Sequence, residues 1–312
     1  MQPLKSGDTI GVISPASKAE AEVFLALSAM AAQRGYKIKI FGNEDHAIGR
    51  MAAEDAERAR HLMDAFADDT VRMVLCARGG YGSGRILDLL DMPRITPKIF
   101  VGYSDITSLL IHLNAHASLT TFHGPMASDL SQKSDPETLD WFFSFLEGRR
   151  LDYKLELAQP QVCKTGHADG PLWGGNISMI TSLLGTNSIH IPDGGILLLE
   201  DVNEFMYSFD RSLVQLKRAG IFESAAAILF ADLKLRDGGA RDNSLGLLLE
   251  EVIEMNLSDF DGPIVTGLPC GHTERQMTIP LGAQAHLSVS ENSLSLSFDD
   301  FWTRDVSHHL AA

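Results

Sequence analysis

Cysteine, aromatic side chains and long apolar runs are all scarce in this chain. Aromatic residues make up 7% of the sequence, and only three of the 312 residues are cysteines, Cys76, Cys163 and Cys270. They lie far apart and show no metal-ligand spacing, so the sequence predicts neither a disulfide scaffold nor a zinc module. Three cysteines cannot all pair within one chain, which indicates a reducing, cytoplasmic location.

No apolar stretch is long enough to span a bilayer, and the first residues lack the longer apolar region of a signal peptide. We therefore expect a soluble protein with no membrane partner. Basic residues are also fewer than acidic ones. The sequence has 26 Lys and Arg residues and 41 Asp and Glu residues, which gives a formal net charge of −15. This balance disfavours nucleic acid as a partner, and an anionic ligand has to meet local positive groups.

The chain does contain short apolar runs that alternate with helical patterns. With 45% apolar residues and 312 residues in total, it is long enough for about two domains with real cores. The expected strands of the first half are 9–16, 36–42, 71–77, 98–104 and 119–124. Segments 19–35 and 52–68 carry apolar residues at helical spacing. This alternation predicts an α/β fold with a mostly parallel sheet covered by helices.

The pattern loosens between about Asp129 and Gly170, where we place a crossover between domains. Residues 131–150 read as one helix, and residues 151–171 are polar and strand-like at best. Buried-strand patterns resume at 194–202, 225–234 and 262–272, and residues 285–298 predict a hairpin with a short polar turn.

Polar side chains follow several of the expected strands. In open parallel sheets, ligands gather outside the carboxyl ends of the strands. Four such places stand out: the glycine-rich stretch RGGYGSGR (78–85), Ser104, the acids Glu200 and Asp201, and His272. A hydroxyl, a carboxylate and an imidazole in these places are the ingredients of a Ser-His-acid hydrolase.

Each feature also has another interpretation. Ser104 is a suitable helix N-cap, the stretch GGYGSG is able to cradle phosphate, and His272 alone is compatible with an incidental loop residue. An ordinary esterase elbow, Gly-x-Ser-x-Gly, is not met, because position 106 is isoleucine. A nucleotide-binding α/β protein therefore remains an alternative to a hydrolase.

Seven sequence blocks, in order and at similar spacing, resemble the LD-carboxypeptidase family of serine peptidases, which also includes microcin self-immunity hydrolases. The blocks are RGGYGSGRILDLLD, FVGYSDITSLL, FHGP, PLWGGNISMITSLLGT, GGILLLEDVNE, FDRSLVQLKRAG and GLPCGH. The resemblance implies a flavodoxin-like or amidotransferase-like N-terminal domain, residues 1–148, that carries the nucleophile. It also implies a swivelling β/β/α-type C-terminal domain, residues 149–312, that carries the acid and the histidine.

The family's triad falls on Ser104, Glu200 and His272, and its glycine-rich oxyanion loop falls on Gly79 and Gly80. The implied activity is release of terminal D-Ala from murein tetrapeptides by hydrolysis of an L-to-D peptide bond, a step of peptidoglycan recycling. Ser104 would attack, His272 would take its proton and Glu200 would fix the imidazole. The backbone N–H of Asp105 and that of Gly80 or Gly79 would hold the oxyanion. The alternative substrate within the family is the acyl-sulfamate linkage of microcin-type antibiotics.

The substrate contacts are less specified. A carboxypeptidase must hold a terminal carboxylate, for which an arginine fork is suited, and Arg78, Arg85 and Arg275 are the candidates. Each is equally compatible with a surface ion pair. Further candidate contacts are Tyr81, Trp173 and Asn176, although Trp173 also fits an interior packing role. We expect a small peptide or muropeptide as the ligand and a homodimer as the assembly.

No cofactor or metal is expected. His112 and His116 are four residues apart on an expected helix, but no metalloprotease glutamate and no third ligand candidate lies nearby. For the two adjacent acids, the alternation of side chains along a strand predicts that only one of them reaches His272. We expect Glu200 to do so and Asp201 to face the other way, where it would hold the following loop or pair with Arg211.

Overall fold

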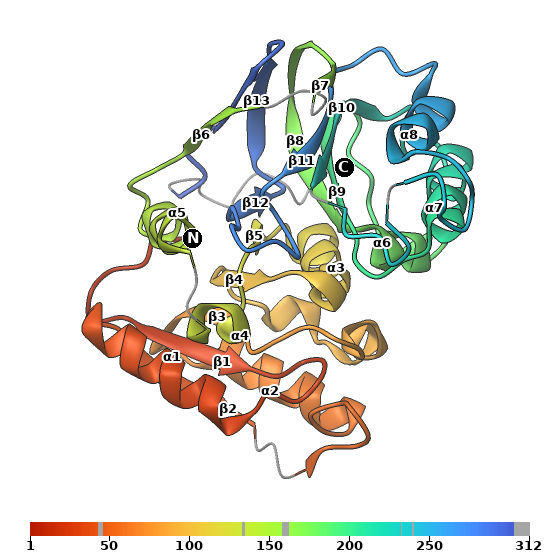
Figure 1. The fold of residues 1–312 in the computed structure, drawn as a ribbon. Coiled ribbons are helices and arrows are strands. Elements are labelled where there is room, and N and C mark those ends of the chain that lie inside the picture. Colours follow the sequence, from red (N-terminus) through yellow and green to blue (C-terminus); the bar gives the residue numbers. More distant parts are fainter. Residues whose placement is uncertain (43–45, 133–134, 158–161, 232, 239, 303–312) are drawn as a thin grey trace. The chain divides into compact units, whose positions relative to one another are not determined.

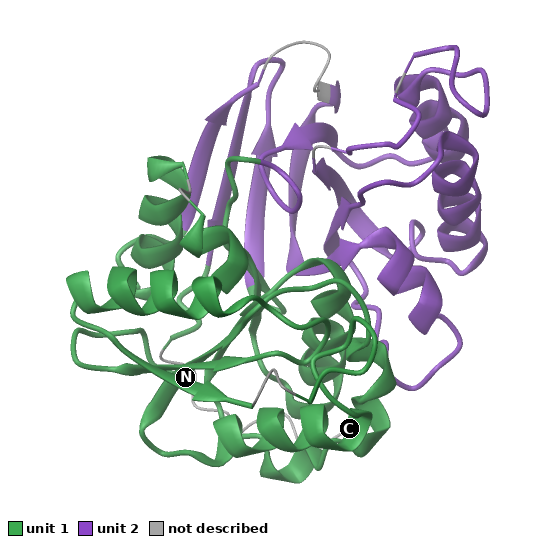
Figure 2. Cartoon of the chain, turned by 60° about the horizontal axis from the view of Figure 1, so that its bottom comes forward, with its two compact units in different colours: residues 1–151, 274–283, 299–312 green, residues 152–273, 284–298 purple. Residues whose placement is uncertain are grey.

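A computed structural model gives the fold (Figure 1) and describes residues 1–42, 46–132, 135–157, 162–231, 233–238 and 240–302. The chain forms two compact units (Figure 2), and neither is one continuous stretch. Unit 1 holds Met1–Leu151, Glu274–Ala283 and a segment that begins at Asp299, while unit 2 holds Asp152–Thr273 and Gln284–Phe298. The division predicted from the sequence, into 1–148 and 149–312, makes each domain one continuous stretch, whereas in the structure the chain returns to unit 1 twice. The return at Glu274–Ala283 arises because strand β12 (Ile279–Leu281) pairs with another strand of unit 1, and after Asp299 the rings of Phe301 and Trp302 pack on Phe122 of unit 1.

Unit 1 is built on a six-stranded sheet in the order β12-β5-β4-β3-β1-β2. Its parallel strands are β1 (Thr9–Ile13), β2 (Lys37–Phe41), β3 (Val71–Cys76), β4 (Ile99–Gly102) and β5 (Thr121–His123). β12 runs antiparallel to β5 at the edge. The order 2-1-3-4-5 is the flavodoxin-like one, so the predicted parallel α/β fold of the N-terminal half is confirmed.

The helices of unit 1 follow from this strand order. They are α1 (Ala21–Gln33), α2 (Asp55–Ala67), α3 (Thr107–Ala117), α4 (Ala127–Ser131) and α5 (Pro136–Leu146), with 3₁₀ turns η2 (Ser83–Arg85), η3 (Leu87–Leu89), η4 (Met92–Arg94) and η5 (Ser104–Ile106). The β1-to-β2 and β2-to-β3 connections run in opposite directions along the sheet. Right-handed crossovers therefore put α1 on one face and α2 and α3 on the other. The contacts agree, since α1 packs on α4 while α2 and α3 both contact η4.

The single helix predicted over 131–150 is shorter in the structure. Helix α4 ends at Ser131 and α5 begins only at Pro136, and residues 133–134 lie outside the described part. Proline fits the first turn of a helix, and the Asp135 side chain caps the helix by accepting the Glu137 N–H at 2.7 Å. The start of α5 is thus set by local chemistry.

Unit 2 is built on an eight-stranded mixed sheet in the order β6-β14-β13-β8-β9-β10-β11-β7. The strands are β6 (Asp152–Glu156), β7 (Val162–Lys164), β8 (Gly166–Asn176), β9 (Gly195–Glu200), β10 (Ala225–Ala231), β11 (Ile264–Leu268), β13 (Gln284–Val289) and β14 (Ser293–Phe298). Strands β8 to β11 are parallel, and the predicted hairpin is β13–β14. Of the weakly strand-like segment 151–171, residues 158–161 lie outside the described part.

The long strand β8 joins the two halves of this sheet. Its residues 166–171 pair antiparallel with β13, and its residues 172–176 pair parallel with β9. Helices α6 (Ile177–Leu183), α7 (Met206–Arg218) and α8 (Leu249–Leu257) complete the unit, with α7 packed on both α6 and α8 (Figure 1). Every residue of β9 is buried, so its last residue, Glu200, is placed by a rigid interior strand.

Candidate active site

Ser104 lies at a sharp corner between β4 and α3 of unit 1. Tyr103 is extended, but Ser104 has a φ of 62°, in the left-handed region that non-glycine residues rarely adopt. Such a conformation costs on the order of 1–3 kcal/mol and persists only where the surroundings enforce it. Ser104 is half-buried between buried neighbours. The corner therefore leaves Ser104 partly exposed at the residue where a helix begins.

The isoleucine that breaks the esterase pattern has a clear place in this corner. A Cβ on Gly102 would lie 2.6 Å from Cγ2 of Ile106, so the Ile106 side chain covers Gly102. Glycine is needed at position 102, and the larger residue two positions after the serine fills the space above it. The corner is consequently built differently from the Gly-x-Ser-x-Gly elbow while it presents the serine in a similar way.

The glycine-rich loop after β3 approaches Ser104 closely. A Cβ on Gly79 would lie 3.0 Å from the Ser104 Cβ and 3.2 Å from its Oγ. The loop also contacts the segment after β1, because Ser17 donates its N–H to Gly79 O at 3.3 Å and its Oγ accepts the Tyr81 N–H at 3.2 Å. Strands β1 and β3 flank the point where the strand order reverses, which is where ligands bind in such sheets.

Unit 2 holds the acid and the histidine in contact. The Glu200 carboxylate is 1% exposed, and its Oε2 lies 2.8 Å from Nδ1 of His272, which is partly exposed. A carboxylate only accepts hydrogen bonds, so Nδ1 carries the hydrogen and Nε2 of the neutral ring is the basic nitrogen. Gly271 permits this approach, because its φ is +76° and a Cβ there would lie 2.7 Å from Glu200 Oε2.

Asp201 faces away from the imidazole and holds backbone instead. Its carboxylate accepts the Val202 N–H at 2.8 Å, the Ser178 N–H at 3.1 Å and the Ser178 hydroxyl at 2.9 Å. Burial raises the pKa of Asp201 to about 6, with the Glu200 charge adding to the effect. The expected contact with the following loop is present. Arg211 is instead bonded to Ser208 Oγ and lies over the Tyr207 ring.

The predicted substrate contacts differ in their surroundings. Arg78 and Tyr81 are exposed in the loop beside Ser104. Arg85 is bound by Asp55, at 3.0 and 2.6 Å, and Arg275 lies 3.0 Å from Glu137, so both are in surface ion pairs.

The two candidates on β8 are interior residues. Trp173 is 4% exposed and packs at the start of β9, where a Cβ on Gly195 would lie 2.7 Å from its ring. Glu200 is at the other end of that strand, and this favours the packing role for Trp173. Asn176 caps α6 by accepting the Met179 N–H and donates to Asp201 at 3.2 Å.

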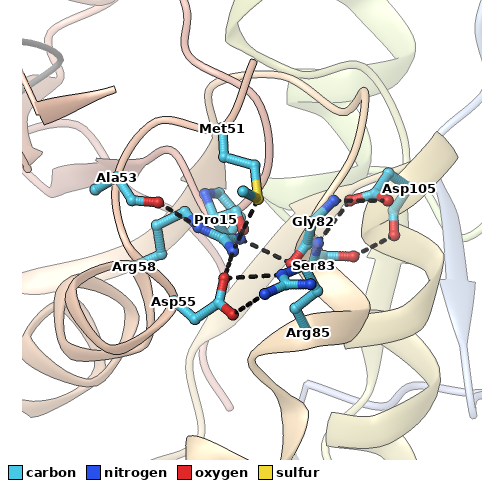
Figure 3. A network of polar contacts seen from close by, with 9 residues as sticks. All are labelled: Pro15, Met51, Ala53, Asp55, Arg58, Gly82, Ser83, Arg85 and Asp105. Carbon is cyan, nitrogen blue, oxygen red and sulfur yellow. Dashed lines mark hydrogen bonds and ion pairs between the residues drawn. The ribbon is translucent and has the colours of Figure 1, made fainter. Parts of the chain in front are cut away.

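Three residues of the site region were not anticipated for their side chains. The Asp105 carboxylate, the Ser17 hydroxyl and the buried Arg58 guanidinium all bind the glycine-rich loop (Figure 3 shows Asp105 and Arg58). Arg58 lies four residues before Leu62, on the apolar face of α2, and that spacing is a sign of burial that the sequence does carry.

Among the described residues, no group of three or more His, Cys, Asp or Glu side chains is arranged to hold a metal ion. The rings of His112 and His116 lie with their centroids 4.5 Å apart and are tilted by 47° to each other, and burial lowers the pKa of His112 to about 4. All three cysteines are free thiols. Within the described ranges, the helices are too short or too polar to cross a membrane.

Comparison of the sequence with known proteins shows which family it matches. Residues 10–124 match the model of the LD-carboxypeptidase N-terminal domain, and residues 169–287 match that of the C-terminal domain. A Bacillus subtilis protein named probable murein peptide carboxypeptidase is 36% identical over 294 residues, which cover 93% of this chain and 92% of that protein. The Escherichia coli microcin C7 self-immunity protein MccF is 25% identical, over 95% of this chain and 94% of its own.

Solved structures agree. The crystal structure of muramoyltetrapeptide carboxypeptidase from Oxalobacter formigenes matches with a TM-score of 0.84 and 29% identity, covering 94% of this chain and 99% of that one. The resemblance expected from the seven sequence blocks and the two-domain α/β architecture are both confirmed. The chain belongs to the LD-carboxypeptidase family of hydrolases.

Proposed function

We propose that the protein is a serine carboxypeptidase that releases terminal D-Ala from murein tetrapeptides by cleaving an L-to-D peptide bond. The observation that carries this proposal is the buried Glu200 carboxylate 2.8 Å from His272 Nδ1, a pair that makes Nε2 a base. Family membership and relatives named for murein peptides support the substrate class.

In the proposed reaction, His272 Nε2 takes the Ser104 proton while Oγ attacks the carbonyl before the terminal D-Ala. The imidazolium, stabilised by Glu200, then gives the proton to the leaving amine, and D-Ala departs from an acyl-enzyme. Water activated by the same imidazole hydrolyses the ester and restores Ser104. The three residues act as one unit, with the serine supplied by unit 1 and the acid–histidine pair by unit 2.

The oxyanion of the tetrahedral intermediate would be held by the N–H of Asp105 and by that of Gly80, with Gly79 as the alternative donor. The closeness of Gly79 to Ser104 supports this placement, since the loop lies at contact distance from the nucleophile. Arg78 is the best candidate for the terminal carboxylate. Arg78 and Arg85 are both exposed in the loop, but Arg85 is engaged by Asp55, and Arg275 is engaged by Glu137.

The alternative of a phosphate cradle is disfavoured by the same loop. The N–H groups of Gly82 and Ser83, which would have to face phosphate, donate to the Asp105 carboxylate at 3.2 and 2.8 Å. A fixed carboxylate therefore already occupies the anion position of this part of the loop, and it would repel phosphate.

The second candidate substrate is a microcin-type acyl-sulfamate, favoured by the similarity to MccF along nearly the whole chain. Incubation with a disaccharide tetrapeptide ending in D-Ala, and separately with a processed microcin analogue, followed by mass spectrometry, decides between them. We expect loss of D-Ala from the tetrapeptide and an intact microcin analogue. Cleavage of the analogue alone would replace the murein proposal, and Ser104→Ala serves as the inactive control in both reactions.

We also propose a cytoplasmic location and a homodimer. Three free cysteines, one of them exposed, are compatible with a reducing compartment. Cell fractionation tests the location, and light scattering coupled to size-exclusion chromatography tests the assembly.

A further inference from the structure

Two side chains form hydrogen bonds with the backbone of the glycine-rich loop at Gly82, one on each side of the loop (Figure 3). The Gly82 N–H donates to Asp105 Oδ1 at 3.2 Å, and the Ser83 N–H donates to Oδ2 at 2.8 Å. On the other side, the Gly82 carbonyl accepts from Arg58 Nη1 at 2.8 Å. Gly82 has a φ of 123°, which side-chain-bearing residues rarely adopt. Two side chains thus fix both peptide groups of a residue that would otherwise be unusually free.

Arg58 ties this loop to two other segments. Its side chain is fully buried and donates to the carbonyls of Ala53, at 3.1 Å, and Pro15, which follows β1. Asp55 binds the same guanidinium and is itself bound by Arg85 at the surface (Figure 3). A buried ion pair is weak evidence for stability, because desolvation offsets the attraction. The contacts of Arg58 instead point to a role in holding loop geometry.

Asp105 connects the two parts of the proposed oxyanion site. Its own N–H belongs to the start of the helix after Ser104, and its carboxylate holds the loop that carries Gly79 and Gly80. The carbonyl of Asp105 also accepts the Ser83 hydroxyl. One buried residue therefore sets the spacing between the two N–H donors. A Cβ on Gly79 would lie 3.0 Å from the Ser104 Cβ, so the loop has little room to move toward Ser104, and its release moves the Gly80 donor away from the oxyanion.

We infer that Asp105, through its carboxylate, and Arg58 are positioning residues that hold the Gly80 N–H at hydrogen-bond distance from the oxyanion. The inference rests on the proposed serine mechanism. It assigns these side chains an effect on the transition state, in addition to any effect on folding, because the displaced donor would bind the oxyanion that forms only in the reaction.

Two matched variants separate positioning from general stabilisation. Lys98 is a buried cation that donates to the Ala65 carbonyl at 3.1 Å and to the Asp68 carbonyl, but it precedes β4 and so lies at the opposite end of the strand from Ser104. The Asp68 carboxylate accepts the Thr70 N–H at 2.9 Å in a turn at that end. Lys98→Met is the control for Arg58→Lys, and Asp68→Asn is the control for Asp105→Asn.

Asparagine at position 105 keeps the shape of the side chain but turns its NH₂ group toward one of the two N–H donors, so one hydrogen bond is lost. We expect Asp105→Asn and Arg58→Lys to lower kcat about 10- to 100-fold with KM changed by less than about threefold. The controls should lower the melting temperature by similar amounts and leave kcat unchanged. If Arg58→Lys does not fold, Asp105→Asn carries the test.

The second readout is the rate at which Ser104 reacts with a fluorophosphonate probe, in which the Oγ–P bond forms as the P–F bond breaks and fluoride leaves with the serine proton. This step needs the oxyanion donors but no peptide substrate. A wild-type protein that reacts with the probe but leaves the tetrapeptide intact contradicts the proposed substrate alone, and the variants' probe rates still test positioning. Probe rates and kcat equal to those of the controls overturn the inference, as does a wild-type Ser104 inert to the probe.

Discussion

The corner at Ser104 and the end of strand β9 present reactive side chains by different means. In unit 1, an unusual backbone conformation at Ser104 and the closely packed glycines Gly79 and Gly102 expose a hydroxyl. In unit 2, the backbone of β9 is regular, and the buried Glu200 carboxylate lies 2.8 Å from Nδ1 of His272, which fixes the hydrogen on Nδ1 and leaves Nε2 without one. The proposed nucleophile thus depends on main-chain geometry, and the proposed acid–base pair depends on side-chain environment.

The largest effect is expected at the corner itself. Ser104→Ala should lower turnover by at least about 10⁴-fold without loss of fold, because a methyl group cannot attack a carbonyl and the oxyanion contacts supply only part of the acceleration. Ser104→Gly should be equally inactive but more stable than Ser104→Ala by about 1 kcal/mol, because glycine adopts a φ of 62° without strain. Turnover and urea unfolding of both variants check this. Equal stabilities would show that the corner is not strained.

At the end of β9, the two adjacent acids should differ. Glu200→Gln should cost on the order of 10⁴ in turnover with little change in melting temperature, since it removes the group that orients the imidazole. Asp201→Asn should act mainly on stability, because Asp201 holds the Ser178 and Val202 N–H groups. Turnover and melting temperature are measured on both. An inactive Asp201→Asn at unchanged melting temperature, beside a normal Glu200→Gln, would make Asp201 the catalytic acid.

A smaller effect is expected in the loop that faces the corner. Gly79→Ala places a Cβ 3.0 Å from the Ser104 Cβ and should lower kcat about 10- to 100-fold by displacing the nucleophile or the loop. Gly84→Ala is the control from the same loop, since its Cβ would lie 3.6 Å from Ser108 Oγ, an ordinary contact. Steady-state kinetics compare the two. Normal turnover by Gly79→Ala would mean that the close approach has no catalytic role.

The last effect concerns the pH dependence of stability at Asp201, with no change expected in the catalytic groups. Its folded-state pKa, about 6, lies above the usual value of 3.8, so its contribution to stability is fully present below about pH 4 and is lost as pH rises through 6. The stability of wild type relative to Asp201→Asn should therefore fall between pH 4 and 7 by up to roughly 3 kcal/mol. Urea unfolding of both proteins across this range measures it. A difference that does not vary with pH contradicts the raised pKa.

Much of the fold follows from the sequence because parallel strands have continuous apolar runs and helices a different period. The same alternation correctly placed Glu200 toward His272 and Asp201 away from it. The hydrogen bond from Arg58 to the Gly82 carbonyl was not predictable, because the two residues are far apart in the sequence and only the tertiary fold brings them together. The return of β12 to unit 1 and the interior position of Trp173 depend likewise on strand pairing that local patterns do not encode.

The central claim is that Ser104 and His272 act together in one catalytic step, with His272 as the base for the Ser104 hydroxyl. It is tested most directly by kcat/KM of Ser104→Ala, His272→Ala and the double variant on the tetrapeptide. The account predicts that the double variant is no slower than either single variant, because removal of one residue already abolishes the step in which both take part. Losses that multiply in the double variant would show that the two residues act independently, and would contradict the triad.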